Sequence, residues 1–265
     1  NRYAAPSSTL VETLQAFDCL AFQLAATNFE PVELSPVSPL GTCSALGTVH
    51  QNKVLSATRH LEVLADCTNV LALECARQRQ ALLKNQPKSQ EKIRLCTSHR
   101  LIRTQPLPDP RFLSHFRIFG LCTAGRDEGS FQFELASLKE HLAFHLSLLT
   151  ATESPFHFEK IEVQITELED GGRSESISQN VLEPLGSSFP AVHFGFFSER
   201  KTGRGYYKSL CFSINTSNSA GDFFNLVDGG FTDWTQKMLE NNKERLLISA
   251  IGSELVCQNF LANKA

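Results

Sequence analysis

Positively charged side chains are concentrated in one segment of this sequence. Ten Lys and Arg residues lie between positions 77 and 117, against only two acidic residues. The segment therefore carries a formal charge of +8 in a 265-residue chain whose net charge is −3. A basic block of this kind favours an anionic ligand, a nucleotide or RNA. The alternative is a solvated surface offset by acidic neighbours such as those in residues 153–183.

Two histidines have the spacing of metal ligands. His141 and His145 are four residues apart in a segment with helical periodicity, which would place both rings on one face. No third ligand is evident, because Glu140 lies beside His141 rather than one turn away. A packing or surface role is therefore the favoured interpretation, and no metal site is predicted.

The eight cysteines form no recognisable framework. None belongs to a C-x-x-C pair, and most lie among apolar residues, which favours free thiols in a reducing compartment. No stretch approaches the ~18 uninterrupted apolar residues of a membrane span. The first residues, NRYAAPSSTL, lack the features of a signal peptide. We therefore expect a cytoplasmic protein without a membrane partner.

The remaining patterns predict the elements that must position any site. With 42% hydrophobic and 20% charged residues, the chain is expected to fold as a single domain over residues 1–265. Periodicity predicts helices over 9–27, 68–84 and 131–149 and from 253. It predicts strands over 30–34, 93–97, 101–104, 115–123, 160–166, 192–199, 206–214, 223–227 and 245–251, with a hairpin around the KTGRG turn. Long helices followed by strands with helices between them indicate an α+β fold around an antiparallel sheet.

Six short motifs follow one another in a familiar order: VLADCT, LIRTQ, HFRIFGLC, GRGYYKSLCFSI, DGGFTDW and IGSEL. Their order and spacing resemble the catalytic core of class II aminoacyl-tRNA synthetases over residues 9–262. The resemblance is closest to histidyl-tRNA synthetase and to its paralogue, the regulatory subunit of ATP phosphoribosyltransferase. It implies a class II synthetase-like antiparallel sheet flanked by helices.

The resemblance assigns roles to matching residues. Asp66 and Thr68 correspond to the amino-acid pocket, Arg103 to the motif 2 arginine that clamps ATP, and Arg204 to the arginine that assists transfer. Arg103 and Arg204 are thus the candidate catalytic residues. The candidate ligand-binding residues are Asp66, Thr68, Gln105, Tyr206, Tyr207, Gly229, Gly230 and Glu254. For the tyrosines, strand alternation places one ring in the cleft and one in the core; for the two glycines, a close approach to a ligand and a plain turn stay open.

Several positions depart from the family pattern. Leu255 stands where motif 3 has an arginine, Gln105 replaces a glutamate, and Ile118 and Cys122 replace residues that hold histidine in the family. Losing one charged contact in a closed site costs ~3 kcal/mol of transition-state stabilisation. Histidine activation is therefore not expected. Half of the family's D-x-E motif survives, at Glu134.

Assembly and domain content also follow from the resemblance. The sequence contains neither the family's helical insertion nor its anticodon-binding domain. Pro36 matches the motif 1 proline, around which the family builds a dimer interface, so we expect a homodimer.

Three functional hypotheses remain open. The preferred one is a non-aminoacylating paralogue that binds an amino acid or nucleotide and acts through a protein partner as a regulatory subunit or sensor. The second is an ATP- and Mg²⁺-dependent ligase that forms an aminoacyl adenylate for a non-tRNA acceptor. The third is a dimeric scaffold that binds RNA through residues 77–117.

Overall fold

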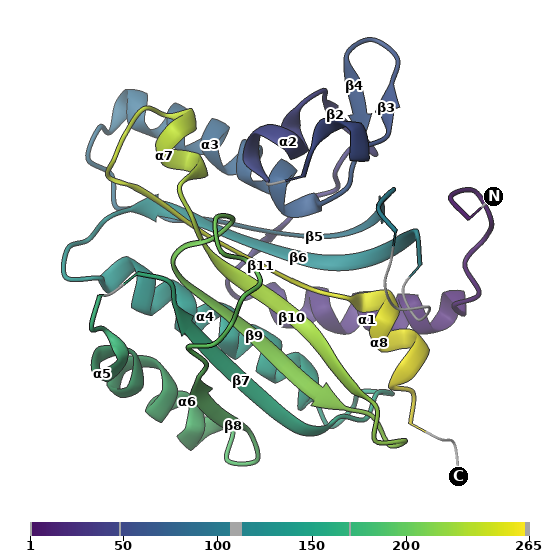
Figure 1. Ribbon diagram of the computed structural model, residues 1–265. Helices are drawn as coiled ribbons and strands as arrows, with labels where there is room; N and C mark the ends of the chain where they lie inside the picture. The colour runs from purple at the N-terminus through teal and green to yellow at the C-terminus, as the bar shows by residue number, and fades with distance from the viewer. Residues whose placement is uncertain (1, 48, 107–112, 170, 263–265) are drawn as a thin grey trace.

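A mixed sheet of eight strands forms the centre of the computed structural model, which describes residues 2–47, 49–106, 113–169 and 171–262 (Figure 1). The strand order is β1-β5-β6-β11-β10-β9-β7-β8, and all pairings except β1–β5 and β7–β8 are antiparallel. The strands are β1 (Glu30–Pro31), β5 (Ile93–Ile102), β6 (His115–Arg126), β7 (Glu159–Glu167), β8 (His193–Phe196), β9 (Lys208–Ser217), β10 (Phe223–Thr232) and β11 (Glu244–Ile251). The predicted α+β class is confirmed.

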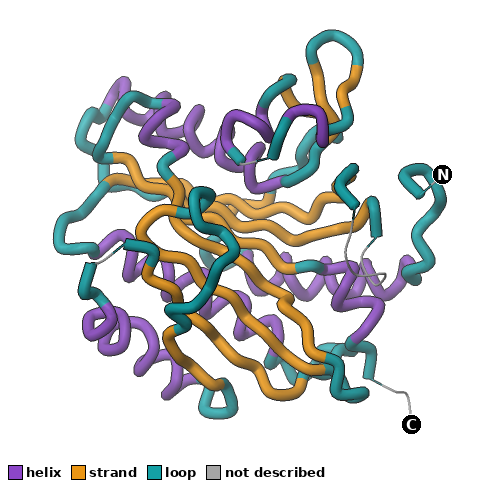
Figure 2. Tube along the Cα trace, in the orientation of Figure 1, coloured by secondary structure: helices purple, strands orange, loops and turns teal. Residues whose placement is uncertain are grey.

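One face of this sheet is covered by helices. They are α1 (Val11–Ala25), α4 (Gln132–Leu149), α5 (Ser174–Ile177) and α6 (Glu183–Ser188), the last two joined by a π-helical turn at Ser178–Leu182. Alternation along β7 points Ile161, Val163 and Ile165 into this layer, where they join the largest hydrophobic cluster. Figure 2 shows α1 and α4 passing behind the strands.

The opposite face is only partly covered. It carries α3 (Cys67–Asn85) and α7 (Trp234–Met238), with α8 (Ser253–Asn259) at one end. A small sheet of β2 (Val37–Pro39), β3 (Ser56–Ala57) and β4 (Leu61–Val63) lies beside α2 (Thr42–Leu46) and a 3₁₀ turn at Gln51–Lys53. Together, α2, α3 and this small sheet border an open part of the main sheet.

One local prediction is wrong, whereas the first predicted helix is present as α1, which begins after Leu10 without a side-chain cap while the Thr9 hydroxyl donates to Glu254. Residues 192–199 and 206–214 do not form a hairpin, since β8 pairs with β7 in parallel. A parallel pairing needs a long crossover, which residues 174–188 supply as helices that the sequence patterns did not predict.

The cysteines agree with the expectation of free thiols. All eight cysteines are free, and all but Cys19 are buried. Among the described residues, the structure contains no helix that is both long and apolar enough to cross a membrane.

Candidate functional site

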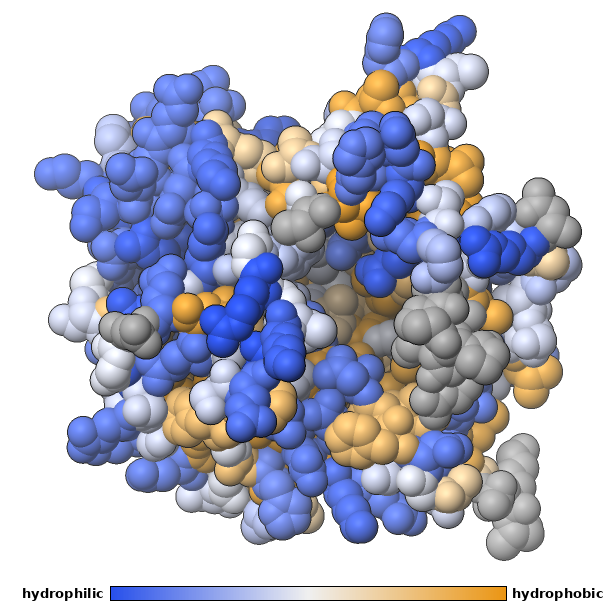
Figure 3. Space-filling model, in the orientation of Figure 1, coloured by the Kyte–Doolittle hydropathy of each residue, from blue (hydrophilic) through white to orange (hydrophobic). Residues whose placement is uncertain are grey.

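The open face of the sheet contains a cavity of about 600 Å³. Figure 3 shows it as a hollow near the centre of the displayed face, with hydrophobic side chains at its floor. Eight of the ten predicted site residues line it: Asp66, Thr68, Gln105, Tyr206, Tyr207, Glu254, Arg103 and Arg204. The sequence motifs therefore converge on one place in the fold.

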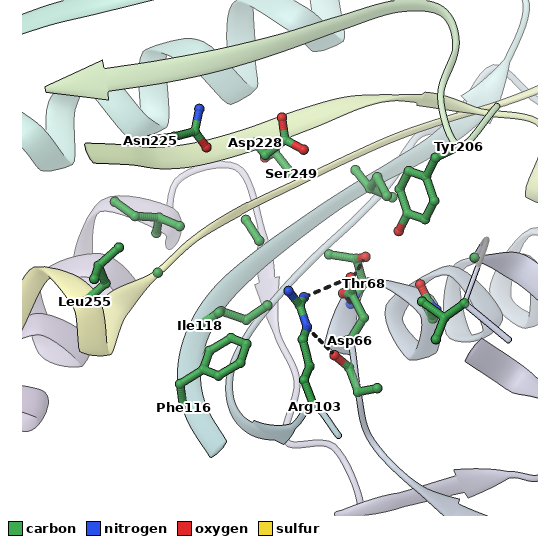
Figure 4. Close-up of a pocket in the computed structure, with 18 of the residues that line it drawn as sticks. Asp66, Thr68, Arg103, Phe116, Ile118, Tyr206, Asn225, Asp228, Ser249 and Leu255 are labelled. Carbon is green, nitrogen blue, oxygen red and sulfur yellow. Dashed lines mark hydrogen bonds and ion pairs between the residues drawn. The ribbon is translucent and has the colours of Figure 1, made fainter. Parts of the chain in front are cut away.

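One end of the cavity is built around Asp66. This residue caps α3, and its Oδ1 accepts hydrogen bonds from the Thr68 amide (2.9 Å) and hydroxyl (2.8 Å), as expected for aspartate before a helix. Arg103 follows β5 and points towards Asp66 (Figure 4). Its Nη2 lies 3.7 Å from Asp66 Oδ2, while Nε donates to the Ala65 carbonyl at 3.2 Å. The guanidinium also stacks on the Phe116 ring, with 5.0 Å to the ring centroid.

The two neighbouring tyrosines play different parts. Tyr206 packs edge-on against Trp234, and burial together with the nearby Asp66 carboxylate raises the pKa of its phenol well above the ordinary value. Tyr207 is 7% exposed, and its hydroxyl donates to Asp228 Oδ2 at 3.0 Å. Both rings line the cavity, although only Tyr207 is fully packed against the sheet.

The second candidate arginine lies on the loop before β9. Arg204 is exposed at the cavity rim, and its Nε donates to the Arg200 carbonyl at 3.1 Å. Arg200, which no motif singled out, is 8% exposed and pairs with Asp228 at 2.5 Å. Gly203, at φ +81, allows this loop to fold over Tyr207, because a Cβ there would lie 2.9 Å from the ring.

Glu254 lies in the cavity wall, and its carboxylate is already occupied by protein donors. It is 1% exposed and accepts from the Ser7 hydroxyl, the Thr9 hydroxyl (3.0 Å) and the Arg117 amide (2.9 Å). Arg100 pairs with it at 2.9 Å. Burial alone would raise the pKa of Glu254, but the hydrogen bonds from Ser7 and Arg100 hold it below the ordinary value. This carboxylate therefore anchors the N-terminal segment.

Gly229 and Gly230 do not belong to the cavity lining. Both lie within β10, so neither alternative considered for them applies. A Cβ at Gly229 would lie 2.6 Å from the Phe212 ring, and one at Gly230 would lie 2.6 Å from the Tyr207 ring. These glycines are required for side-chain packing on the two faces of the strand.

Within the described part of the chain, two side chains of the cavity lining have acceptors without partners, and one of them, Asn69, carried no signal in the sequence. Asn69 is 2% exposed, and its Oδ1 has no hydrogen-bond partner among the described residues. The Gln105 Oε1 is likewise buried without a partner. Buried acceptors of this kind are costly unless a ligand or water donates to them. They add to the hydrogen-bonding capacity of the cavity lining.

Ile118 and Leu255, two hydrophobic residues that depart from the family pattern, line the cavity without closing it. Phe231 belongs to the cluster on the helix-covered face, where its ring lies 6.5 Å from that of Phe131. The cleft is therefore open.

Comparison with solved structures gives matches over nearly the whole chain. Apo histidyl-tRNA synthetase from S. aureus has a TM-score of 0.69 at 13% identity, covering 95% of this chain and 67% of that one. The chain has the fold of a class II synthetase core. An ATP phosphoribosyltransferase regulatory subunit/histidyl-tRNA synthetase from Bacillus halodurans C gives 0.68 at 12% identity, covering 97% and 82%. A histidine–tRNA ligase subunit from Alicyclobacillus acidocaldarius gives 0.65 at 10% identity, covering 96% and 95%.

Sequence comparisons add nothing to this result. Neither protein-family profiles nor curated protein sequences give a match. At these identities the likeness establishes the fold alone, so function has to be argued from the cavity.

The cavity lacks one of the cations that the resemblance assigns to ATP, because Leu255 stands where motif 3 has an arginine and offers no charge. Glu134, the surviving half of the family's D-x-E motif, lies on α4 and pairs with Arg245 at 2.9 Å, on the helix-covered face. Within the described ranges, no cluster of three His, Cys, Asp or Glu could hold a metal.

The basic block does not form one anion-binding face. Of its nine described cations, seven pair with carboxylates, and only Lys84 and Lys88 have no ion pair among the described residues. Arg94 pairs with Glu140 on the helix-covered face, whereas Arg103 lies on the cavity face. Carboxylates therefore neutralise most of the block, although none of these partners lies in residues 153–183. Arg111 and the proline-rich loop at 107–110 lie outside the described residues.

The histidine pair lies under the sheet rather than in the cavity. His141 and His145 are both fully buried and share the Ser249 hydroxyl, at 2.8 and 2.9 Å. Thr123 contacts the other ring nitrogen of His141 at 2.9 Å. Burial lowers the pKa of His145 to about 3 and that of His141 well below its ordinary value. The packing interpretation of this pair is confirmed.

Proposed function

We propose that this chain binds an amino acid in its cavity, does not convert it to an adenylate, and acts through a partner protein as a regulatory subunit or sensor. The proposal is supported by the charges that remain free in the lining. Asp228, Glu254 and Arg117 pair with Arg200, Arg100 and Asp18, which leaves the Asp66 carboxylate beside the Arg103 and Arg204 guanidinium groups. A carboxylate next to guanidinium groups suits a zwitterion, whose ammonium it attracts, better than a polyphosphate, which it repels.

The observation that carries the proposal is the loose pairing of Arg103 with Asp66. At 3.7 Å, these groups attract each other without forming a hydrogen bond. Both side chains are partly exposed to the cavity, at 38% and 23%. Asp66 can therefore accept from a ligand ammonium while Arg103 donates to a ligand carboxylate. The other two carboxylates are occupied by protein donors.

Calorimetric titration of the full chain with a panel of L-amino acids tests the proposal. Arg103→Gln and Asp66→Asn should each weaken binding about 10- to 100-fold, because each removes one charged hydrogen bond. Arg77→Gln is the matched control, since Arg77 pairs with Glu74 on the exposed side of α3. A saturating ligand, at 100 times its dissociation constant, should add ~2.7 kcal/mol to the free energy of unfolding.

The same samples test whether the amino acid is activated. ATP–pyrophosphate exchange should be absent with every amino acid that binds. Exchange that Arg103→Ala abolishes would establish the ligase hypothesis instead. A folded chain that binds none of the panel would refute the amino-acid site.

Assembly and location belong to the same proposal. We expect a homodimer, so sedimentation at micromolar concentration should give twice the 29.4 kDa chain mass; a monomer would contradict this. The free, mostly buried thiols support a cytoplasmic location.

A further inference from the structure

The floor of the cavity is apolar over two neighbouring strands. Ile118 on β6 and Ile248 and Ala250 on β11 line it, with Leu255 of α8 beside them. In the strand register, Ala250 lies opposite Gly120 and Ile248 lies opposite the fully buried Cys122. These positions form a continuous apolar strip.

This strip begins beneath the charged end of the cavity. A Cβ on Gly120 would lie 2.8 Å from Cys67 Sγ and 3.5 Å from Thr68 Cγ2. The first turn of α3, which Asp66 caps, therefore lies directly over this part of β6. A ligand whose ammonium contacts Asp66 would extend its side chain along the strip.

The polar side chains beside the strip are already paired. Asp228, in register with Ala250, accepts from Arg200 and Tyr207 through its two oxygens. Asn225 donates its amide to Asn215 at 2.9 Å. The unpartnered acceptors, on Asn69 and Gln105, belong to α3 and to the segment after β5 rather than to the floor.

We propose that the ligand is an α-amino acid with an apolar side chain, such as leucine or methionine. The inference rests on the proposed amino-acid site and specifies what that site selects. Each methylene that the strip takes from water strengthens binding about fourfold. A polar side chain of the same shape loses its water hydrogen bonds there without replacement, which weakens binding about tenfold or more.

Isosteric ligands provide the sharpest experiment. Leucine and asparagine have the same branched shape and the same ammonium and carboxylate. Methionine and glutamine form a second apolar and polar pair of similar length. In calorimetric titrations of the full chain, leucine and methionine should bind at least about tenfold more tightly than asparagine, glutamine and histidine. This difference isolates the strip from the charged end of the cavity.

Variants of the strip test the same point from the protein side. Ile118→Gln should reduce the preference for leucine over asparagine by about tenfold, because it supplies a hydrogen-bonding amide. Leu255 is only half-buried on α8, so Leu255→Gln provides a second variant if Ile118→Gln fails to fold. Leu40→Gln is the control, since Leu40 is 44% exposed and lies outside the lining.

The outcomes separate the two proposals. Equal or tighter binding of histidine, asparagine or glutamine would overturn the apolar preference and leave the amino-acid site intact. A folded chain that binds no amino acid would overturn both. If Ile118→Gln and Leu255→Gln both leave the preference for leucine over asparagine unchanged, the strip does not determine the preference.

Discussion

Two arginines of the basic segment 77–117 form ion pairs that differ in burial and in distance. Arg79 and Glu244 are both 0% exposed and bond at 2.8 and 2.9 Å, and the carbonyls of Glu91 and Ser89 accept two further hydrogen bonds from Arg79. Arg103 and Asp66 are 38% and 23% exposed and lie 3.7 Å apart. The first pair has no capacity left for a ligand, whereas the second retains donors and acceptors in an open cavity.

Glu254 shows that a place in the cavity wall is not sufficient for binding. It lines the same cavity as Asp66, but hydroxyl, amide and guanidinium donors already surround its carboxylate. Saturation by protein partners, rather than position or charge, therefore separates structural from ligand-accessible groups in this molecule.

The largest effect should come from breaking the buried pair. Arg79→Leu should lower the free energy of unfolding by about 3–5 kcal/mol, because it leaves the Glu244 carboxylate buried without a partner. Chemical denaturation of the purified chain measures this loss. Amino-acid affinity, measured where the variant remains folded, should change little, since neither residue lines the cavity.

A double variant distinguishes the lost charge from lost packing. Arg79→Met combined with Glu244→Leu removes both charges and should recover most of the stability. If the double variant is as unstable as Arg79→Leu, the side-chain shapes rather than the ion pair hold this region together.

A second buried polar cluster should respond to pH. Unfolded histidines titrate near pH 6.5, whereas burial lowers the pKa of His145 to about 3 and that of His141 well below 6.5, helped by the nearby Arg94. The unfolded chain therefore binds more protons below pH 6.5, and stability is lost as pH falls from 6.5 towards 3. At pH 5.5 the two histidines together should cost about 2–3 kcal/mol.

Denaturation curves at pH 7.5 and 5.5 measure this slope. His145→Phe should remove about half of it, because one buried titrating ring is gone. His157→Gln is the control, since His157 is exposed. A slope that His145→Phe leaves unchanged would mean that other groups determine the acid sensitivity.

The sequence predicts most elements and several residues of the cavity, but not which arginine is saturated by protein partners. Periodicity places α3, α4 and most strands, and the motif order brings Asp66, Arg103, Tyr206 and Glu254 into one cavity. Arg79 appears in the sequence only as a member of the +8 block, whereas Arg103 also belongs to the LIRTQ motif. Whether an arginine is saturated depends on partners up to 165 positions away, as for Arg79 and Glu244, and such contacts leave no local pattern.

The same limit explains the errors at individual positions. Gly229 and Gly230 resemble ligand-binding glycines, but their small size is required by Phe212 and Tyr207, which approach them across the sheet. The parallel pairing of β8 depends on a helical crossover whose Ser- and Glu-rich sequence resembles a loop. Asn69 and Arg200 matter only through tertiary burial, which no motif encodes.

The smallest effect on stability should come from breaking the Arg103–Asp66 pair in the cavity. This measurement decides whether that pair differs from Arg79–Glu244 as we infer. Arg103→Gln should change the free energy of unfolding by less than about 1 kcal/mol, because a partly exposed pair gains little from Coulomb attraction in solvent. Arg103→Gln should nevertheless weaken amino-acid binding more than Arg79→Leu does, because a bound ligand replaces the solvent around Arg103. Parallel denaturation and titration of Arg103→Gln and Arg79→Leu measure both quantities. If Arg103→Gln destabilises the fold as strongly as Arg79→Leu, then Arg103 is a structural group, and the distinction between saturated and ligand-accessible pairs fails in this cavity.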